Sequence, residues 1–180
     1  ILRGDTLIGK NCTIGPNTYL ENVRVDDGTV IRASHAFNST IGYDAQVGPF
    51  AYIRPGSAIG SGVKVGDFVE VKNSVIGDGT KIAHLTYVGD SDVGQNVNFG
   101  CGTVTVNYDR AQKHRTTIGD NAFIGCNTNL IAPVTVGDGA YTAAGSTITE
   151  DVPPQALAVA RARQSNKKDW AARHKLKQPK

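Results

Sequence analysis

The sequence lacks the features that mark secreted, membrane and disordered proteins. It has no apolar run of the about 20 residues that a membrane-spanning helix needs. Residues 1–10 lack the basic start and apolar centre of a signal peptide. Charged residues make up 19% of the chain and hydrophobic residues 39%, which argues against disorder. We therefore expect a cytoplasmic protein with no membrane partner.

Cysteine is scarce and methionine is absent. The three cysteines, Cys12, Cys101 and Cys126, lie far apart and form no Cys-X-X-Cys pair. That pattern argues against a disulfide framework and a structural zinc site, and it fits a reducing compartment. Because the chain has no initiating methionine, we expect it to be a piece of a longer protein.

What the chain does have is a fixed spacing of aliphatic residues. A helix would place apolar residues three and four apart, and a single strand would alternate them. A step of six is instead typical of hexapeptide repeats, in which each short strand returns one aliphatic side chain to a common core. The step is clearest at Ile41, Val47, Ile53, Ile59, Val65 and Val71.

The same spacing recurs from Ile8 to Ile148, with occasional steps of five. Because one coil takes three strands and about eighteen residues, we expect roughly seven coils. The predicted fold is an all-β, parallel β-helix over residues 1–160, in which each coil is stabilised by its neighbours.

Three segments interrupt the spacing. It blurs from Gly28 to Asn38, where we expect an irregular coil. Residues 105–117 hold no aliphatic repeat position and are polar and basic, so we expect an excursion loop suited to a ligand or subunit contact. Pro153 and Pro154 should end the ladder, because proline cannot donate a hydrogen bond to a sheet.

Charge is unevenly distributed along the chain. Residues 161–180 form a basic C-terminal arm with eight Lys or Arg and one Asp, a net charge of +7. The other residues carry eleven basic and fifteen acidic side chains, a net charge of −4. An anionic ligand or partner would suit this arm. Nucleic acid is not expected, because Trp170 is the arm's one aromatic residue and no binding motif is present. Around Trp170 we expect a short helix or a flexible arm.

Polar side chains gather in the middle of the chain. Arg54 and Lys72 are about one coil apart, so their side chains should lie one above the other. Neighbouring cations repel unless they share an anion, which favours a phosphate or carboxylate ligand, although Lys72 could pair with Glu70. His84 follows a repeat position by two residues, so alternation points it inward or along a corner. It is either a general base or a structural residue.

Two longer runs carry a family resemblance. The first begins at Phe68 and is FVEVKNSVIGDGTKIAHLTYVGDSDVGQNVNFGCGTVTVNYD; the second begins at Gly119 and is GDNAFIGCNTNLIAPVTVGDGAYTAAGS. Their most specific motifs are HLTY at 84–87 and NYD at 107–109. Residues 1–163 resemble the carboxy-terminal acetyltransferase domain of the bacterial bifunctional N-acetylglucosamine-1-phosphate uridyltransferase/glucosamine-1-phosphate N-acetyltransferase. The resemblance implies a left-handed coil and N-acetylation of glucosamine 1-phosphate by acetyl-CoA, on the route to UDP-N-acetylglucosamine for the bacterial cell wall.

The resemblance also implies residue roles. His84 corresponds to the general base that takes a proton from the sugar amine as it attacks the thioester. Arg54 and Lys72 correspond to sugar-phosphate ligands, and Glu70 is the candidate for orienting the base. The implied sugar contacts are Tyr87 and Asn98; the acetyl-CoA contacts are Cys101, Asn107, Tyr108, Cys126, Ala144 and Arg161; and Lys113 is a further basic contact.

Two positions depart from the family pattern. The family often has Ser where this chain has Cys126, and Ala where it has Cys101. A thiol is a weaker donor than a hydroxyl, which argues against a side-chain oxyanion donor at position 126, whereas a backbone N–H could still serve. The resemblance further implies a homotrimer. It places uridyl transfer and Mg²⁺ in an N-terminal domain absent from this chain, so no metal site is expected here.

Three other interpretations remain open. Another hexapeptide-repeat O- or N-acetyltransferase, acting on serine or a different sugar, would share the coil. A γ-type carbonic anhydrase would need clustered histidines, but the four histidines are dispersed. An ice-binding helix would need repeated Thr-X-Thr rows, and the two present, Thr103–Thr105 and Thr147–Thr149, lie on different coils.

Overall fold

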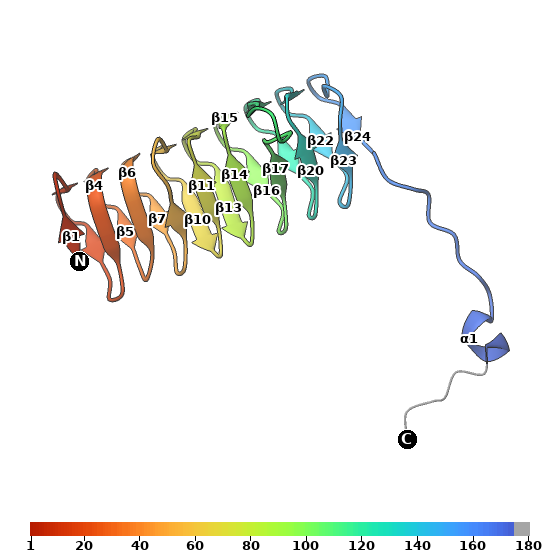
Figure 1. The fold of residues 1–180 in the computed structure, drawn as a ribbon, viewed down its shortest axis with the longest axis horizontal. Coiled ribbons are helices and arrows are strands. Elements are labelled where there is room, and N and C mark those ends of the chain that lie inside the picture. Colours follow the sequence, from red (N-terminus) through yellow and green to blue (C-terminus); the bar gives the residue numbers. More distant parts are fainter. Residues whose placement is uncertain (175–180) are drawn as a thin grey trace.

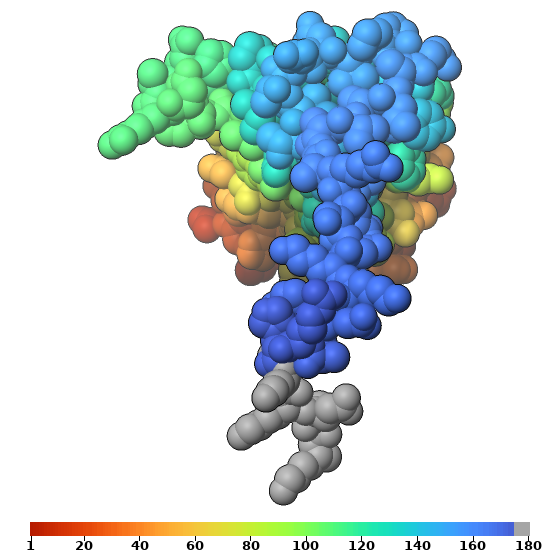
Figure 2. Space-filling view, turned by 90° about the vertical axis from the view of Figure 1, so that its right-hand side faces the viewer, coloured from red at the N-terminus to blue at the C-terminus, as the bar shows by residue number. Residues whose placement is uncertain are grey.

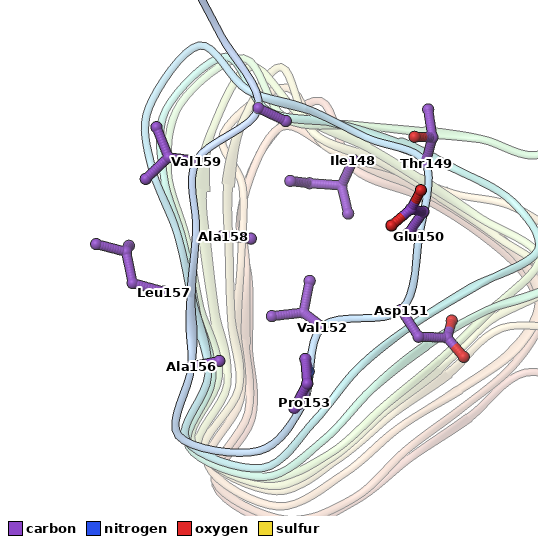
Figure 3. A pocket seen from close by; sticks show the side chains of 11 residues that line it. Ile148, Thr149, Glu150, Asp151, Val152, Pro153, Ala156, Leu157, Ala158 and Val159 are labelled. Carbon is purple, nitrogen blue, oxygen red and sulfur yellow. The ribbon is translucent and has the colours of Figure 1, made fainter.

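The computed structural model describes residues 1–174, which form a stack of short parallel strands with one short helix (Figure 1). Each strand pairs with the equivalent strand of the neighbouring turn. Seen from the C-terminal end, the turns lie one behind another (Figure 2), and each is roughly triangular (Figure 3). The fold is a left-handed parallel β-helix, and the all-β prediction is confirmed.

The strands line three faces of a triangular prism. Two long strands, β4 (Tyr19–Val25) and β6 (His35–Ile41), cross the corner between the first and second faces. The first face continues with β1 (Leu2–Arg3), β8 (Tyr52–Ile53), β11 (Glu70–Lys72), β14 (Tyr87–Gly89), β17 (Val104–Val106), β20 (Asn129–Ile131) and β23 (Thr147–Ile148). The second face has β2 (Leu7–Ile8), β9 (Ala58–Ile59), β12 (Val75–Ile76), β15 (Ser91–Val93), β18 (Thr116–Ile118) and β21 (Val134–Val136). The third face has β3 (Thr13–Ile14), β5 (Val30–Ile31), β7 (Gln46–Val47), β10 (Lys64–Asp67), β13 (Lys81–His84), β16 (Asn98–Phe99), β19 (Phe123–Ile124), β22 (Tyr141–Thr142) and β24 (Leu157–Ala158).

The core is a set of aliphatic columns inside the prism. Each face turns side chains inward, where they pack against the equivalent side chains of the next turn. Burying one such side chain contributes about 1.5–3 kcal/mol to stability. The six residues whose spacing predicted the fold are at most 3% exposed: Ile41, Val47, Ile53, Ile59, Val65 and Val71.

The stack has more turns than the spacing predicted. The third face contains nine strands, so residues 1–174 make about nine turns and the expected seven is wrong. Some turns are shorter than eighteen residues: Thr13 pairs with Val30, and Val30 with Gln46. These shorter turns interrupt the six-residue spacing of the aliphatic residues. Turns near the ends of the stack could therefore not be recognised from that spacing.

The segment from Gly28 to Asn38 is regular, contrary to expectation. It contains β5 and the first half of β6, which continue the third and first faces. The spacing blurs there because Ser34 and Ala36 are buried at inward positions that larger aliphatic residues occupy elsewhere.

The two prolines do not end the ladder. Val152 bridges to Val136, and β24 pairs with β22 beyond the prolines. Pro153 and Pro154 lie in the intervening turn, where no ladder hydrogen bond is needed from them. Figure 3 looks onto this last turn, with Val152 pointing into the triangle.

The excursion loop is narrower than residues 105–117. β17 extends to Val106 and β18 begins at Thr116, so the loop comprises residues 107–115. Thr105 and Thr116 are fully buried and take inward positions in place of aliphatic residues. A pattern of aliphatic residues alone therefore missed both strand ends.

Beyond Ala160, whose backbone still bonds to Ser146 and Thr147, the chain leaves the prism as an arm (Figure 1). Of the two alternatives expected around Trp170, a short helix or a flexible arm, the structure has the helix, α1 (Trp170–Arg173). Three lysines of the basic arm, Lys175, Lys177 and Lys180, lie outside the described residues. Within residues 1–174, no helix has the length and apolar character needed to cross a membrane.

Candidate active site

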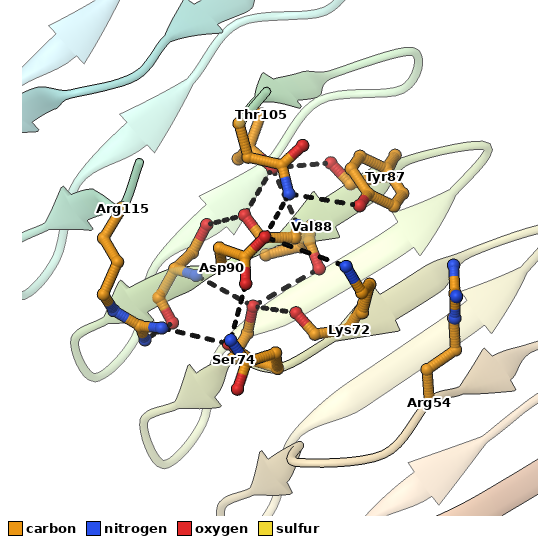
Figure 4. Close-up of polar contacts among 12 residues, drawn as sticks. Arg54, Lys72, Ser74, Tyr87, Val88, Asp90, Thr105 and Arg115 are labelled. Carbon is orange, nitrogen blue, oxygen red and sulfur yellow. Dashed lines mark hydrogen bonds and ion pairs between the residues drawn. The ribbon is translucent and has the colours of Figure 1, made fainter. Parts of the chain in front are cut away.

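Polar side chains of the first face lie side by side on neighbouring turns. Glu70 of β11 pairs in register with Tyr52 of β8 and with Tyr87 of β14. The residue that follows each of these three positions along its strand is buried in the core. Because side chains alternate along a strand, the three polar side chains themselves point outward. Arg54 and Lys72 are neighbours on this face, as their spacing predicted (Figure 4).

Three cations form a cluster on this face: Arg54, Lys72 and, from the excursion loop, Lys113. Arg54 Nη1 lies 2.7 Å from Glu70 Oε1, and Lys72 Nζ lies 3.9 Å from Asp90 Oδ2. The nearby amine of Lys113, together with burial, lowers the pKa of Lys72. Lys72 therefore pairs with Asp90 and not with Glu70. Such a cation cluster is suited to binding a phosphate.

A buried carboxylate lies at the corner between the first and second faces. Asp90 is 4% exposed. Its Oδ1 accepts a hydrogen bond from Asn73 Nδ2 at 2.5 Å, and its Oδ2 accepts one from Asn107 Nδ2. Burial raises the pKa of Asp90, but the two amide donors and Lys72 outweigh burial and hold the pKa below its ordinary value. Lys72 and Asn107 thus contact the same carboxylate.

Tyr87 lies against the backbone of its own strand. A Cβ added to Gly89 would lie 2.3 Å from Tyr87 Oη. Any side chain at position 89 would therefore clash with the Tyr87 ring. Asn107 Nδ2 donates to Tyr87 Oη at 3.4 Å. Tyr87 is therefore held beside the cation cluster, where a sugar contact was predicted.

His84 occupies the corner between the third and first faces, at the end of β13. Its side chain is 61% exposed, so the inward alternative is wrong and the corner alternative is confirmed. His84 Nδ1 lies 2.9 Å from Asp67 Oδ1, and this hydrogen bond lowers the pKa of Asp67. The contact engages one ring nitrogen with a carboxylate and leaves Nε2 for a substrate.

The carboxylate beside His84 is Asp67 and not Glu70, which corrects the prediction for Glu70. Glu70 lies on the first face and accepts from Arg54 at 2.7 Å. Sequence reasoning missed Asp67. Asp67 pairs in register with His84 on the next turn, so the length of one turn could have identified Asp67 from the sequence.

The corner of His84 continues as a row of small side chains. Successive pairing of β13, β16, β19 and β22 aligns His84, the last residue of β13, with residues that follow the other three strands. Both cysteines of the row are exposed. Arg161 extends it, because its Cδ lies 3.9 Å from a Cβ placed on Gly145. The corner row is His84, Cys101, Cys126 and Ala144.

Asn98 lies on a different face from the other predicted sugar contact. It belongs to β16 of the third face, between Lys81 and Phe123 of the adjacent turns. Tyr87 belongs to β14 of the first face. Within one chain, the corner that carries His84 separates Asn98 from Tyr87.

The excursion loop projects beside the prism (Figure 2). Asp109 Oδ1 accepts from the backbone N–H groups of Gln112 at 2.7 Å and Ala111 at 2.8 Å, and Oδ2 lies 2.7 Å from His114 Nε2. The Gln112 contact, followed by those of His114 and Ala111, lowers the pKa of Asp109 to about 2. The predicted contact Tyr108 is exposed on this loop.

Arg115 fixes the base of the excursion loop. Its Nη2 and Nε donate to the two carboxylate oxygens of Asp92 at 2.6 and 2.8 Å. Nη2 also donates to the backbone oxygen of Ser91 at 3.0 Å. This bidentate contact holds the loop near the second face and keeps Lys113 close to Lys72.

The site therefore combines a cation cluster, a carboxylate–histidine pair and a corner row that can accommodate an extended ligand. Across residues 1–174, no group of three or more His, Cys, Asp or Glu side chains is placed to hold a metal ion. The chemistry available in these residues is proton transfer by His84 and anion binding by the cation cluster.

Comparisons with known proteins agree with the repeat architecture. The model described as "Bacterial transferase hexapeptide (six repeats)" matches residues 38–73 and 115–150. The model "Hexapeptide repeat of succinyl-transferase" matches residues 6–33. Together the two models cover more than half of the chain.

A close relative is the "Bifunctional protein GlmU" of Brevibacillus brevis. It is 62% identical over 170 residues, which cover 94% of this chain and 37% of the relative. The chain thus spans well under half the length of this relative.

Two solved structures share the fold. The UDP-N-acetylglucosamine acyltransferase LpxA from Bacteroides fragilis has a TM-score of 0.75 at 20% identity, covering 85% of this chain and 66% of that chain. A variant of GDP-perosamine N-acetyltransferase from Caulobacter crescentus, in complex with CoA and GDP-perosamine, has a TM-score of 0.50 at 20% identity, covering 86% of this chain and 53% of that one.

Proposed function

Because this chain belongs to the bacterial hexapeptide-repeat transferases, we propose that it moves the acetyl group of acetyl-CoA to the amine of glucosamine 1-phosphate. The observation that carries the proposal is the position of His84 at one end of the corner row, on the corner that borders the face carrying the cation cluster. The high identity to a bifunctional GlmU protein supports the choice of substrate. CoA in the complex of the Caulobacter N-acetyltransferase supports the choice of acetyl donor.

His84 would act as the general base. Asp67 accepts from Nδ1–H, so Nε2 is the nitrogen that can take a proton. The sugar amine attacks the thioester carbon; the C–N bond forms, the C–S bond breaks, and the amine proton passes through His84 to the leaving CoA thiolate. A positioned acid–base group contributes about 10² to 10⁴ in rate.

The cation cluster would bind the sugar phosphate. Arg54, Lys72 and Lys113 converge on one side of the His84 corner, and Tyr87 lies beside them. Arg54 remains paired with Glu70 in a bridge that leaves its other guanidinium donors available. A phosphate bound there would place the sugar ring near the base.

The corner row would receive the pantetheine arm of acetyl-CoA. Cys101, Cys126 and Ala144 lie in one line from His84 toward Arg161. The cationic Arg161 suits the phosphates at the far end of coenzyme A. With a thiol at Cys126, we assign the thioester oxygen to a backbone N–H, which the side chain does not alter.

We also infer that a second copy completes the site in a homotrimer. Asn98 faces away from Tyr87 within one chain, whereas packing prisms around a threefold axis brings the third face of one copy toward the first face of its neighbour. The groove between copies would also supply the depth that a ligand as large as coenzyme A needs.

Uridyl transfer and its Mg²⁺ are proposed for the longer protein. The chain covers 37% of the GlmU relative from Brevibacillus brevis, so the nucleotide chemistry would need residues outside it. A cytoplasmic location, and a role in making UDP-N-acetylglucosamine for the cell wall, are proposed on the same grounds.

Release of free thiol from acetyl-CoA tests the acetyl transfer. We expect thiol release with glucosamine 1-phosphate, and none with serine or without an acceptor. Release with serine alone would favour another hexapeptide-repeat acetyltransferase. No release with any acceptor would contradict the proposed reaction.

A further inference from the structure

Asparagines recur at the corner between the first and second faces. Asn22, Asn38 and Asn73 have φ values of 54°, 42° and 46° there, a left-handed conformation that asparagine tolerates. An amide side chain both donates and accepts, so it can bond to the turn before and the turn after. Asn22 Nδ2, for example, donates to Asn38 Oδ1 at 3.1 Å.

Asp90 occupies this corner on its own turn with a carboxylate at φ 49°. An ionised carboxylate only accepts hydrogen bonds, so the amides on both sides must turn their donors toward it. Asn73 donates to Oδ1 and Asn107 to Oδ2. The carbonyl oxygen of Asn107 is consequently turned away from Asp90. Within the described part of the chain, that oxygen receives no hydrogen bond.

The corner itself does not require a carboxylate. Asparagine holds the equivalent place on several turns, and those turns stack in the same parallel register. A charge buried to this degree carries a desolvation cost that a neutral amide avoids. What distinguishes this turn is the pair of contacts that the carboxylate makes with Lys72 and Asn107. We therefore attribute the carboxylate to these contacts.

We propose that Asp90 is a positioning residue of the acetyltransferase site. It holds the ammonium group of Lys72 toward the sugar phosphate. It also orients Asn107 so that the carbonyl oxygen accepts a hydrogen bond from an amide N–H of the pantetheine arm of acetyl-CoA bound along the corner row of a neighbouring copy. This inference rests on the function proposed above, since it assigns the two side chains to the two substrates.

Asp90→Asn tests the role, because it removes the charge at nearly constant shape. We expect kcat/KM to fall about 10- to 100-fold, in line with the loss of hydrogen bonds to a charged group, with higher KM for both substrates. Loss of folded protein alone would lower kcat and leave KM unchanged. As the pH is raised, the KM for glucosamine 1-phosphate should begin to increase at a lower pH in Asp90→Asn than in the unsubstituted protein. The reason is that Asp90 favours the protonated form of Lys72, so without its charge Lys72 loses its proton more readily.

A matched control is Asp78→Asn. Asp78 Oδ1 accepts from the backbone N–H of Ser61 at 2.7 Å, so it is also a corner carboxylate that bonds to a neighbouring turn. It has no contact with the proposed site. We expect its KM values to stay unchanged. Asp90→Asn values within about threefold of the unsubstituted protein, with an unchanged pH profile, would overturn the proposal.

Side-chain amide NMR separates this inference from the proposed function. If the unsubstituted protein releases no thiol, the function fails, whereas the orientation of Asn107 is still measurable. Its NH₂ resonances should move in Asp90→Asn, and resonances that stay in place would overturn the inference. If that variant does not fold, the same resonances of the unsubstituted protein should follow the acid titration of Asp90; resonances independent of pH would overturn it.

Discussion

Asp67 and His84 touch at 2.9 Å because their separation in sequence is one turn of the coil. The same rule made Arg54 and Lys72 predictable neighbours, since in-register stacking depends only on the backbone. It did not predict that Glu70 bonds to Arg54 in place of orienting His84. That outcome depends on the side of the corner from which each side chain projects, and the spacing of residues alone does not determine that direction.

The first residue-scale prediction concerns His84. His84→Ala should lower kcat/KM for acetyl transfer at least about 10²-fold, because it removes the base. The side chain is largely exposed, so the melting temperature should stay unchanged. Thr135→Ala, at an exposed position of β21 on the second face, is the control. Residual His84→Ala activity within about threefold of the unsubstituted protein would remove His84 from this role.

A second prediction concerns the thiols. Alkylation of Cys101 and Cys126 should inhibit acetyl transfer, and acetyl-CoA should protect, because both thiols are exposed in the corner row. Cys12 lies near the other end of the stack, where its Sγ is 3.2 Å from the backbone oxygen of Asp26. Its modification should be silent. Full activity after complete alkylation of Cys101 and Cys126, measured by mass spectrometry and thiol release, would show that the row is not the acetyl-CoA path.

At the scale of elements, the excursion loop is a folded unit built around Asp109. Polar composition predicted the loop but not its ends, since Thr105 and Thr116 are buried within the flanking strands. The aspartate accepts from Gln112, His114 and Ala111 in the ordered loop. None of these contacts follows a repeat, so the spacing of the coil could not have predicted them.

The pH dependence of the loop follows from the depressed pKa of Asp109. A lowered carboxyl pKa stabilises the ordered loop fully above the ordinary value near 4, and that contribution is lost as the pH falls through about 2. The backbone amide resonances of Ala111 and Gln112 should therefore titrate near pH 2. In Asp109→Asn the same resonances should not titrate there. A midpoint near 4 in the unsubstituted protein would mean that the carboxylate is not bound as described.

At the scale of the whole molecule, the coil could be predicted from aliphatic spacing because every turn repeats the same inward positions. The number of turns could not, because Thr13, Val30 and Gln46 are joined by turns shorter than eighteen residues. The prism also divides the predicted site between faces. Asn98 and Tyr87 lie on different sides of the His84 corner, which no linear pattern of repeats reveals.

A homotrimer has a simple physical signature. Sedimentation equilibrium should give a mass about three times that of the 19.0 kDa chain. A fully active species of one chain mass would contradict the assembly.

Mixing two inactive variants tests the central claim, a single acetyltransferase site built by neighbouring copies. His84→Ala and Asn98→Ala would each disable every site in a homotrimer. After unfolding and joint refolding in equal amounts, about a quarter of the sites should combine an intact His84 from one copy with an intact Asn98 from the next. Thiol release with glucosamine 1-phosphate should then return to about a quarter of that of the unsubstituted protein. Mixed trimers that form but remain as inactive as either variant alone would contradict the account.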